Sequence, residues 1–422
     1  MSCRNPSFAL LALCAALAAL PAAAQETRAP AAAPEAASAS APAQITLTEY
    51  LQLVARNNPQ LMAQRLEVKA AEADTTTAGA WPNPTVSYNR HRFENSVSVE
   101  QPLPIFGQRS QRIKTARQAE QAAAMQVQGN VQELVNGAAH AFIEVQIAQQ
   151  KLALWQAGRD DFAKAERVVN GQIEAGARSR YDGARVAMQR AQVEVQLKKA
   201  NAELQEAVVK MAALAAMPAW RPQAFGSLKP LPPQALGGFD TLWEQAQGRL
   251  PAIRTADAEL ELARQQVLLQ KREAMPAVAV NYGRIRNRND GNYNQVGVSV
   301  EVPLFDRKQG AIARAEVGVV QAEHRREAAE VAAKAELVRS LQQLDLKREA
   351  LRDFEDSGMA QMGSLRQMTE DAYRLGKSSI LDLIDALQTL HERRMDHLDL
   401  TKEMLEAEWE LRLASGNVPA VE

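Results

Sequence analysis

Two turns with the pattern Gly-x-x-Ser-x-x-Asp carry the most clearly organised polar residues of this 422-residue sequence. The first turn has Gly176, Ser179 and Asp182, and the second has Gly376, Ser379 and Asp382. A glycine can end a helix in the left-handed conformation, and a serine can cap the next helix while an acid complements its first turn. We therefore expect each turn to connect two helices. Acidic residues lie just before both turns, and such groups can attract cations.

The remaining polar residues indicate neither an enzyme nor a metal centre. The five histidines are scattered, and even His391 and His397 lack the i, i+4 spacing of a helical zinc site. Methionines such as Met359, Met362 and Met368 fit helix packing better than a soft copper site, which is the alternative. The sequence has no glycine-rich phosphate loop, no Gly-x-Ser-x-Gly elbow and no His-Glu-x-x-His motif. We expect no catalytic residue, no cofactor and no bound metal.

The composition excludes further classes of protein. The chain has 49 Lys+Arg against 50 Asp+Glu, so it lacks the basic excess of a nucleic-acid-binding protein. Aromatic residues make up only 5% of the chain, which is low for a large globular core. After residue 24, no apolar run approaches the ~20 residues that a membrane-spanning helix needs.

The N-terminal residues 1–24 are typical of a secretory signal peptide. Arg4 precedes an apolar stretch over residues 8–20, and three alanines at 22–24 form a small-residue cleavage site. A membrane anchor is the alternative. Cys14 follows Leu13 rather than a small residue, so we expect no lipidation. Residues 25–44 are rich in Ala, Pro and Ser, and they predict a disordered tether.

The rest of the chain has the pattern of an internal duplication. Besides the two turns, the segment Val97–Leu103 matches Val298–Leu304 in sequence and in order. We place the first repeat at residues 45–217 and the second at 239–417. A Pro/Gly-rich connection, 218–238, separates them, and 418–422 form a short tail.

Each repeat is expected to contain a helix, two strands, a very long helix and a further helix. In the first repeat a helical stretch covers about 47–79, and residues 85–90 and 95–101 alternate apolar and polar side chains as strands do. Apolar residues then recur at steps of three and four, which indicates a heptad seam. The seam comprises Ala124, Val127, Val131, Leu134, Ala138, Ala141, Val145, Ala148, Leu152 and Trp155. The long helix is expected over 108–173, and its uninterrupted counterpart over about 308–373.

Four amphipathic strands need a partner for their apolar face and for their edges. In lipid an open sheet edge leaves backbone groups without hydrogen bonds, and outer-membrane barrels start at about 8 strands. Several chains would therefore have to share one barrel. The helices would extend its wall as a second, helical cylinder; a helical bundle with a filled centre is the alternative to this cylinder. Arg284, Arg286 and Arg288 continue the outward phase of the second pair of strands. They would mark an extracellular rim near lipid phosphates, or else a flexible loop.

The duplicated plan, the two turns and the segment Val99–Arg109 (VEQPLPIFGQR) together resemble the TolC-type outer-membrane efflux proteins. The segment is most similar to the heavy-metal, CzcC-like branch of that family. The resemblance implies a mainly α-helical fold with a small β part. In a homotrimer, four strands from each chain would form a 12-stranded β-barrel, and the long helices would form an α-barrel that reaches into the periplasm.

The resemblance also assigns roles to the two turns, which would be the periplasmic tips. The residues expected to dock the adaptor protein are Gly176, Ala177, Arg178, Ser179 and Asp182, with Gly376, Lys377, Ser378, Ser379 and Asp382. Glu174, Glu370 and Asp371 are candidates for an acidic ring, which would attract cations and resist closure of the pore. A solvated outer face is the alternative for these acids.

The function implied by the resemblance is that of a passive duct in a tripartite efflux system. The duct would lie in the outer membrane of a Gram-negative bacterium and would receive substrate from an RND-type inner-membrane pump and its periplasmic adaptor. The expected substrates are divalent cations such as cobalt, zinc and cadmium. A duct for drugs or other organic solutes, and an exported coiled-coil spacer that conducts nothing, are the alternatives.

Overall fold

The computed structural model describes residues 44–226, 238–289, 291–359 and 362–418. The predicted signal peptide, the tether up to residue 43, most of the predicted connection and residues 419–422 of the tail lie outside the described residues. The architecture below is that of the unit Gln44–Glu422 alone.

The first half of this unit runs from a short helix through a hairpin to two long helices. Its elements are α2 (Leu47–Asn57), α3 (Pro59–Ala78), β2 (Thr85–Arg90), β3 (Glu94–Leu103), α4 (Gln108–Glu174) and α5 (Arg180–Leu214). The prediction of one helix over about 47–79 was wrong, because Asn58 is extended between α2 and α3 (φ −67°, ψ 117°). A residue before proline is disfavoured in the helical conformation, and Pro59 instead starts α3.

The second half repeats this order of elements. They are α6 (Phe239–Ala246), α7 (Pro251–Glu273), β5 (Ala277–Asn287), β6 (Gly291–Glu301), α8 (Gln309–Phe354), the π-helical turn η2 (Glu355–Met359), α9 (Met362–Arg374) and α10 (Ile380–Ala414). Two-residue strands β1 (Gln44–Ile45) and β4 (Gln223–Ala224) pair in parallel beside the first half. The limits of the two repeats remain a prediction.

The expected uninterrupted helix over about 308–373 was also wrong. The helical segment changes from α8 to the π-helical η2 at Glu355, and the described helix α9 covers Met362–Arg374. The sequence Asp-Ser-Gly near this point combines residues of low helix propensity. Ser357 Oγ donates a hydrogen bond to the carbonyl oxygen of Asp353, which competes with regular helical bonding.

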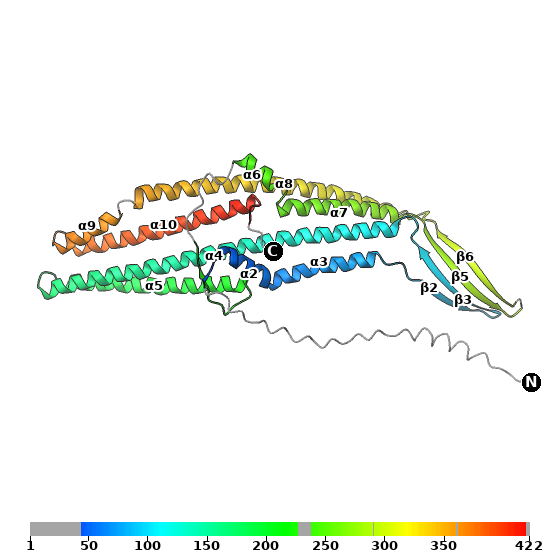
Figure 1. Cartoon of the computed structure of the whole chain (residues 1–422), viewed down its shortest axis with the longest axis horizontal. Coiled ribbons are helices and arrows are strands. Elements are labelled where there is room, and N and C mark those ends of the chain that lie inside the picture. The colour runs from blue at the N-terminus through cyan, green and yellow to red at the C-terminus, as the bar shows by residue number, and fades with distance from the viewer. Residues whose placement is uncertain (1–43, 227–237, 290, 360–361, 419–422) are drawn as a thin grey trace, which may run out of the picture. The chain divides into compact units, whose positions relative to one another are not determined.

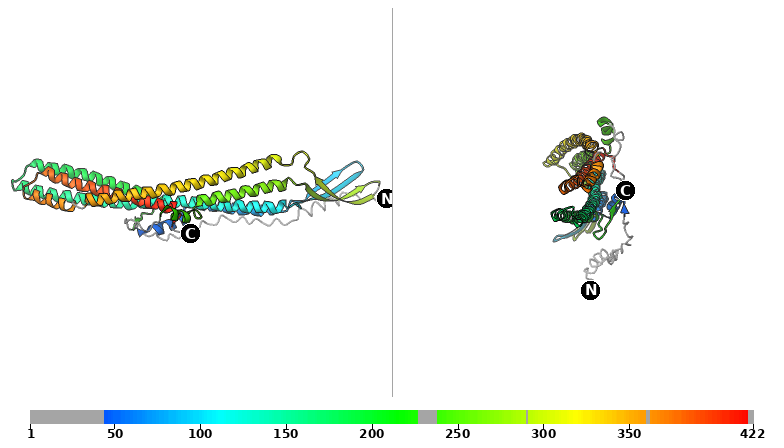
Figure 2. Two further views of the ribbon diagram at one scale, coloured as in Figure 1. Left: turned by 90° about the horizontal axis from the view of Figure 1, so that it is seen from above. Right: turned by 90° about the vertical axis from the view of Figure 1, so that its left-hand side faces the viewer.

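Helix α4 is the central element of the helical part. Its 67 residues span on the order of 100 Å at ~1.5 Å per residue, and it packs against α3, α5, α7 and α10 (Figures 1 and 2). The predicted seam is confirmed, because none of its ten side chains is exposed and Ala138, Ala141 and Val145 are at most 1% exposed. None of the helices in the described ranges is long and apolar enough to cross a membrane.

A four-stranded antiparallel sheet follows the helices at one end (Figure 1). Its order is β2-β3-β5-β6, so the hairpins of the two halves join through β3 and β5. Val99 lies opposite Tyr282, and Leu103 opposite Val278. The sheet is therefore one continuous surface to which both halves of the chain contribute.

The two faces of this sheet differ in polarity, as the alternation predicted. Cross-strand partners share a face, and the rows of partners collect most of the apolar residues on one side, although Ile285 and Tyr293 pair on the other. The apolar residues of this face that are exposed are Val86, Tyr88, Val97, Val99, Val280, Tyr282, Val296, Val298 and Val300. Arg284 and Arg286 lie on the same face, as expected, whereas Arg288 lies beyond the end of β5 and not in the strand.

Candidate functional site

The first predicted turn closes α4 and opens α5 through standard capping bonds. Gly176 is left-handed (φ 72°), and its N–H donates to the carbonyl of Ile173 at 2.9 Å. The N–H of Ala177 donates to the carbonyl of Gln172 at 2.8 Å, which completes a Schellman motif. Ser179 Oγ accepts from the N–H of Asp182 at 3.4 Å, so the serine caps α5. The chain thus reverses direction with its helix-end groups satisfied.

The second turn has the same geometry with a stronger cap. Gly376 is left-handed (φ 74°), and the N–H of Lys377 donates to the carbonyl of Ala372 at 2.8 Å. The Asp382 carboxylate accepts from both the N–H and the Oγ of Ser379, each at 2.8 Å, forming a capping box. The backbone bond from Ser379, followed by the side-chain bond, lowers the pKa of Asp382.

The two turns lie side by side and are joined by Arg178. Its Nη2 donates to the carbonyl of Ser378 at 3.1 Å, and its guanidinium lies 4.9 Å from the ring centroid of Tyr373. Tyr373 is 1% exposed and packs in a core cluster with Val169, Val186 and residues of α10. Burial raises the pKa of Tyr373, while Arg178 opposes this shift. Arg178, predicted to contact a partner, is therefore also bound within its own chain.

The other predicted docking residues are at the surface. Gly176, Ala177, Ser179, Gly376, Lys377, Ser379 and Asp382 are exposed, while Asp182 and Ser378 are half-buried. Sequence reasoning missed the exposed apolar side chains beside them: Tyr181 is 63% exposed, Leu375 68% and Leu381 48%. Tyr181 and Leu381 each follow the capping serine by two residues. This equivalent position in the two turns could have predicted them from the sequence. Both turns lie at the end of the helices farthest from the sheet (Figures 1 and 2).

The candidate acids near the turns do not form a cluster within one chain. Glu174 and Asp371 are exposed, and Asp371 forms an ion pair with Arg374 at 3.8 Å. Glu370 is half-buried and has an interaction within the chain. Over the ranges that the structure describes, no three His, Cys, Asp or Glu residues meet in a group that could hold a metal ion.

The histidines near α10 serve packing and ion pairs. His391 lies against Trp155 with ring centroids 3.9 Å apart, and burial, followed by Arg394, lowers its pKa. His397 Nε2 lies 2.9 Å from Glu355 Oε1 in the π-helical turn. His140 is hydrogen-bonded to Glu406, which raises the pKa of the imidazole.

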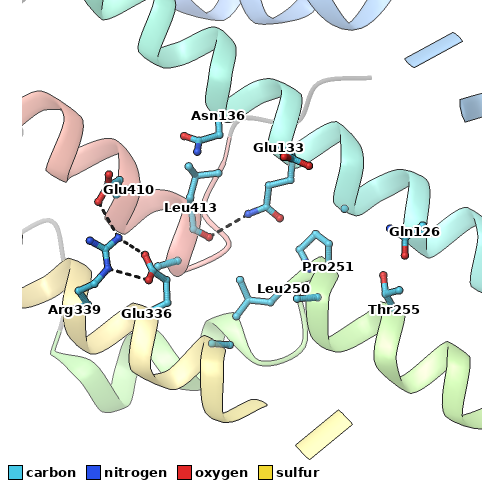
Figure 3. A pocket seen from close by; sticks show the side chains of 15 residues that line it. Gln126, Glu133, Asn136, Leu250, Pro251, Thr255, Glu336, Arg339, Glu410 and Leu413 are labelled. Carbon is cyan, nitrogen blue, oxygen red and sulfur yellow. Dashed lines mark hydrogen bonds and ion pairs between the residues drawn. The ribbon is translucent and has the colours of Figure 1, made fainter. Parts of the chain in front are cut away.

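A cavity of about 610 Å³ lies where α7 and α10 meet α4 and α8 (Figure 3). Arg339 crosses one side of it, 2.6 Å from Glu336 and 3.2 Å from Glu410. Arg339 lowers the pKa of Glu336 through its hydrogen bond. This cavity could not be predicted from the sequence, because its walls come from residues far apart in the chain.

The exposed sheet and the long helices define the class of protein. In the described part of the chain, β2 and β6 each pair with one neighbour only, and the apolar face of the sheet is exposed. Such a sheet, continued by helices of up to 67 residues, has the architecture of a subunit of an outer-membrane channel.

The chain belongs to the outer membrane efflux protein family, whose model matches residues 50–216 and 242–417. It is 24% identical over 381 residues to the cobalt-zinc-cadmium resistance protein CzcC of Cupriavidus metallidurans, covering 86% of this chain and 88% of CzcC. It is 29% identical to the nickel-cobalt-cadmium resistance protein NccC of Alcaligenes xylosoxydans xylosoxydans, covering 63% of each chain. The Campylobacter jejuni CmeC outer membrane channel has the same fold, with a TM-score of 0.72 at 11% identity, over 88% of this chain and 85% of CmeC.

These comparisons confirm the resemblance that the turns and the segment Val99–Arg109 suggested. The protein is located in the outer membrane, and its family and structural neighbours are channel proteins rather than enzymes. The predicted fold class, mainly helical with four strands in a sheet, is confirmed. The barrel shared between chains remains a prediction.

Proposed function

We propose that this protein is the passive outer-membrane duct of a tripartite exporter for divalent heavy-metal cations. The observation that carries the proposal is the exposed apolar face of the sheet, on which Val296 is 73% and Val298 66% exposed. Such a face needs lipid or a partner to cover it. The names of two relatives support a metal substrate. CzcC is a resistance protein for cobalt, zinc and cadmium, and NccC is a resistance protein for nickel, cobalt and cadmium.

The edges of the sheet support a homotrimer. The free edges of β2 and β6 carry backbone groups that need hydrogen-bond partners in lipid. If β2 of one copy pairs with β6 of the next, the barrel closes without an edge. Three copies supply the 12 strands that the family resemblance implies. This number of strands is above the minimum of ~8 found in bacterial outer-membrane barrels.

The helices then continue the wall of the duct into the periplasm. The two turns are the proposed docking site for the adaptor, which connects the duct to an RND-type inner-membrane pump. Tyr181, Leu375 and Leu381 support this role, because exposed apolar side chains near an exposed Lys377 suit a protein interface. The proposed docking residues remain those of the two Gly-x-x-Ser-x-x-Asp turns.

The acids near the turns are the proposed cation filter. Repetition of Glu174, Glu370 or Asp371 around a three-fold axis would give a ring of negative charge. The metal ions are substrates that pass through the ring and are not held by it. A ring of weak, hydrated contacts suits passage better than a tight site does, because a conducted ion also has to leave.

The test is deletion of the gene, followed by growth on a panel of metals and drugs. The proposal predicts lower tolerance of zinc, cobalt or cadmium, restored by the intact gene, with drug tolerance unchanged. Lower drug tolerance with unchanged metal tolerance would instead indicate a duct for organic solutes. If neither tolerance changes, both efflux assignments are wrong and the spacer function is favoured.

A further inference from the structure

Three arginines gather at the far end of the exposed apolar face of the sheet. The register places Arg90, Arg284 and Arg286 on that face, near the turns that close the two hairpins. Arg90 and Arg286 both lie opposite Asn95 on β3, so these three residues form one row. Arg284 lies opposite Val97 in the next row. The cluster therefore draws on both halves of the chain, and no single segment of the sequence reveals it.

The spacing lets all three side chains reach one ligand. Neighbouring strands are about 4.8 Å apart, and residues two apart on a strand are separated by about 7 Å. Arg90 and Arg286 are two strands apart, which gives about 10 Å between their backbones. Arg284 is two residues from Arg286 on the same strand. Long, flexible arginine side chains can bridge these distances to the phosphate groups of a single molecule.

Among the described residues, the charges on this face have no acidic partner. All three arginines are exposed, and none forms an ion pair with a described residue. The apolar face carries no acid in any of the four strands, whereas Glu94, Glu100 and Glu301 point to the opposite face. A cluster of cations without acids beside an apolar surface is complementary to a ligand that has both an anionic group and an apolar body.

The position of the cluster matches the boundary between hydrocarbon and headgroups. From Leu103 to Val97 the apolar face extends about 20 Å along β3, at ~3.4 Å per residue. Tyr88 lies in the same row as Arg284, as expected for an aromatic residue at a membrane interface. Arginine on the lipid face of a barrel is costly at the bilayer midplane but costs little near the interface. The arginines thus lie where phosphate groups of lipids are found.

We propose that Arg90, Arg284 and Arg286 form a binding site for a phosphorylated glycolipid of the outer leaflet, of the lipid A type. The guanidinium groups bind the phosphates in bidentate geometry, and the valines and tyrosines of the same face contact the acyl chains. This goes beyond the proposed function, because it concerns the lipid around the barrel and not the cargo inside it. It rests on one part of the proposed function, namely the orientation in which the helices reach into the periplasm and the hairpin turns lie at the outer surface.

The test measures binding of bis-phosphorylated lipid A and of its dephosphorylated form to the full-length protein in a neutral detergent, by native mass spectrometry. We expect the dephosphorylated lipid to bind at least tenfold more weakly. The double variant R284Q/R286Q should bind lipid A about 30-fold more weakly, and addition of R90Q should bring the loss to on the order of 100-fold. These values correspond to about 1 kcal/mol for each cation near anionic lipid, at 1.4 kcal/mol per tenfold.

The control variant R307Q/R314Q removes the same charge near the other end of the sheet. Arg307 and Arg314 are exposed and form no described side-chain bond, so this variant should lose less than threefold in affinity. The R90K/R284K/R286K variant keeps the charge but loses the bidentate geometry, so its affinity should lie between those of the intact protein and the triple glutamine variant. Equal affinity for both forms of the lipid would overturn the proposal, and this comparison uses the unaltered protein. An equal loss in R307Q/R314Q, or full displacement by millimolar inorganic phosphate, would also overturn it.

Discussion

The contribution of Arg178 to the stability of the two turns can be measured by substitution. The substitution Arg178→Ala removes the hydrogen bond to the carbonyl of Ser378 and the guanidinium over Tyr373. A half-exposed bond from a charged donor contributes about 1 kcal/mol, and a cation–π contact of this kind about 1 kcal/mol more. The expected loss is about 2 kcal/mol of local stability, which makes opening of the turns roughly 30-fold more frequent.

The assay is amide hydrogen exchange of the purified protein, without any adaptor. Exchange should become faster in the segments around 172–182 and 372–383, because these amides report local opening of the turns. Exchange in the middle of α4, around Ala138 and Val145, should be unchanged, since those residues are buried far from the turns.

The matched control is Lys377→Ala in the second turn. Lys377 is exposed, and its side chain forms no described bond, so its loss should leave exchange unaltered. If R178A and K377A exchange alike in the absence of an adaptor, Arg178 does not hold the turns together and the reasoning from the two contacts is refuted.

Three further predictions concern the caps of the same turns. Ser379→Ala should raise amide exchange at the start of α10 more than Ser179→Ala does at the start of α5, because only Ser379 has the reciprocal bonds of a capping box; equal effects would contradict this. The lowered pKa of Asp382 implies stabilisation of α10 that is present above the ordinary aspartate range and is lost as pH falls through the lowered pKa. Exchange at this helix start should rise on acidification in the intact protein, and Asp382→Asn should abolish that dependence. Gly376→Ala should lower stability by about 1 kcal/mol, measured by denaturant unfolding, because an alanine at φ 74° is strained; Gly310→Ala, at a helical glycine with open space, is the control and should not destabilise.

Local patterns predicted the parts of this fold that depend on neighbours in sequence. The spacing of Gly176 and Ser179 specified a helix end and a helix start, and both have the expected geometry. The steps of three and four in α4 predicted which side chains are covered, and Ala138 and Val145 are fully buried. Alternation in the strands predicted an apolar face because side chains of a strand point alternately to its two sides.

Features that depend on contacts between distant segments were not predicted. The hydrogen bond of Arg178 joins the equivalent turns of the two halves, 200 residues apart in the chain, and no periodicity specifies it. The arginine cluster became visible only when β3 and β5 brought Arg90 and Arg286 into one row. The π-helical turn η2 was not predicted, because no proline marks it and the hydrogen bond from Ser357 to the carbonyl of Asp353 is not apparent from the sequence.

The most direct test of the duct is the conductance of the purified full-length protein in planar lipid bilayers. The proposal predicts discrete channels that prefer cations, with a preference that falls when Glu174, Glu370 and Asp371 are replaced by their amides. A correctly folded protein that inserts but never conducts, before or after those replacements, would contradict the proposal that this protein is a channel for exported cations.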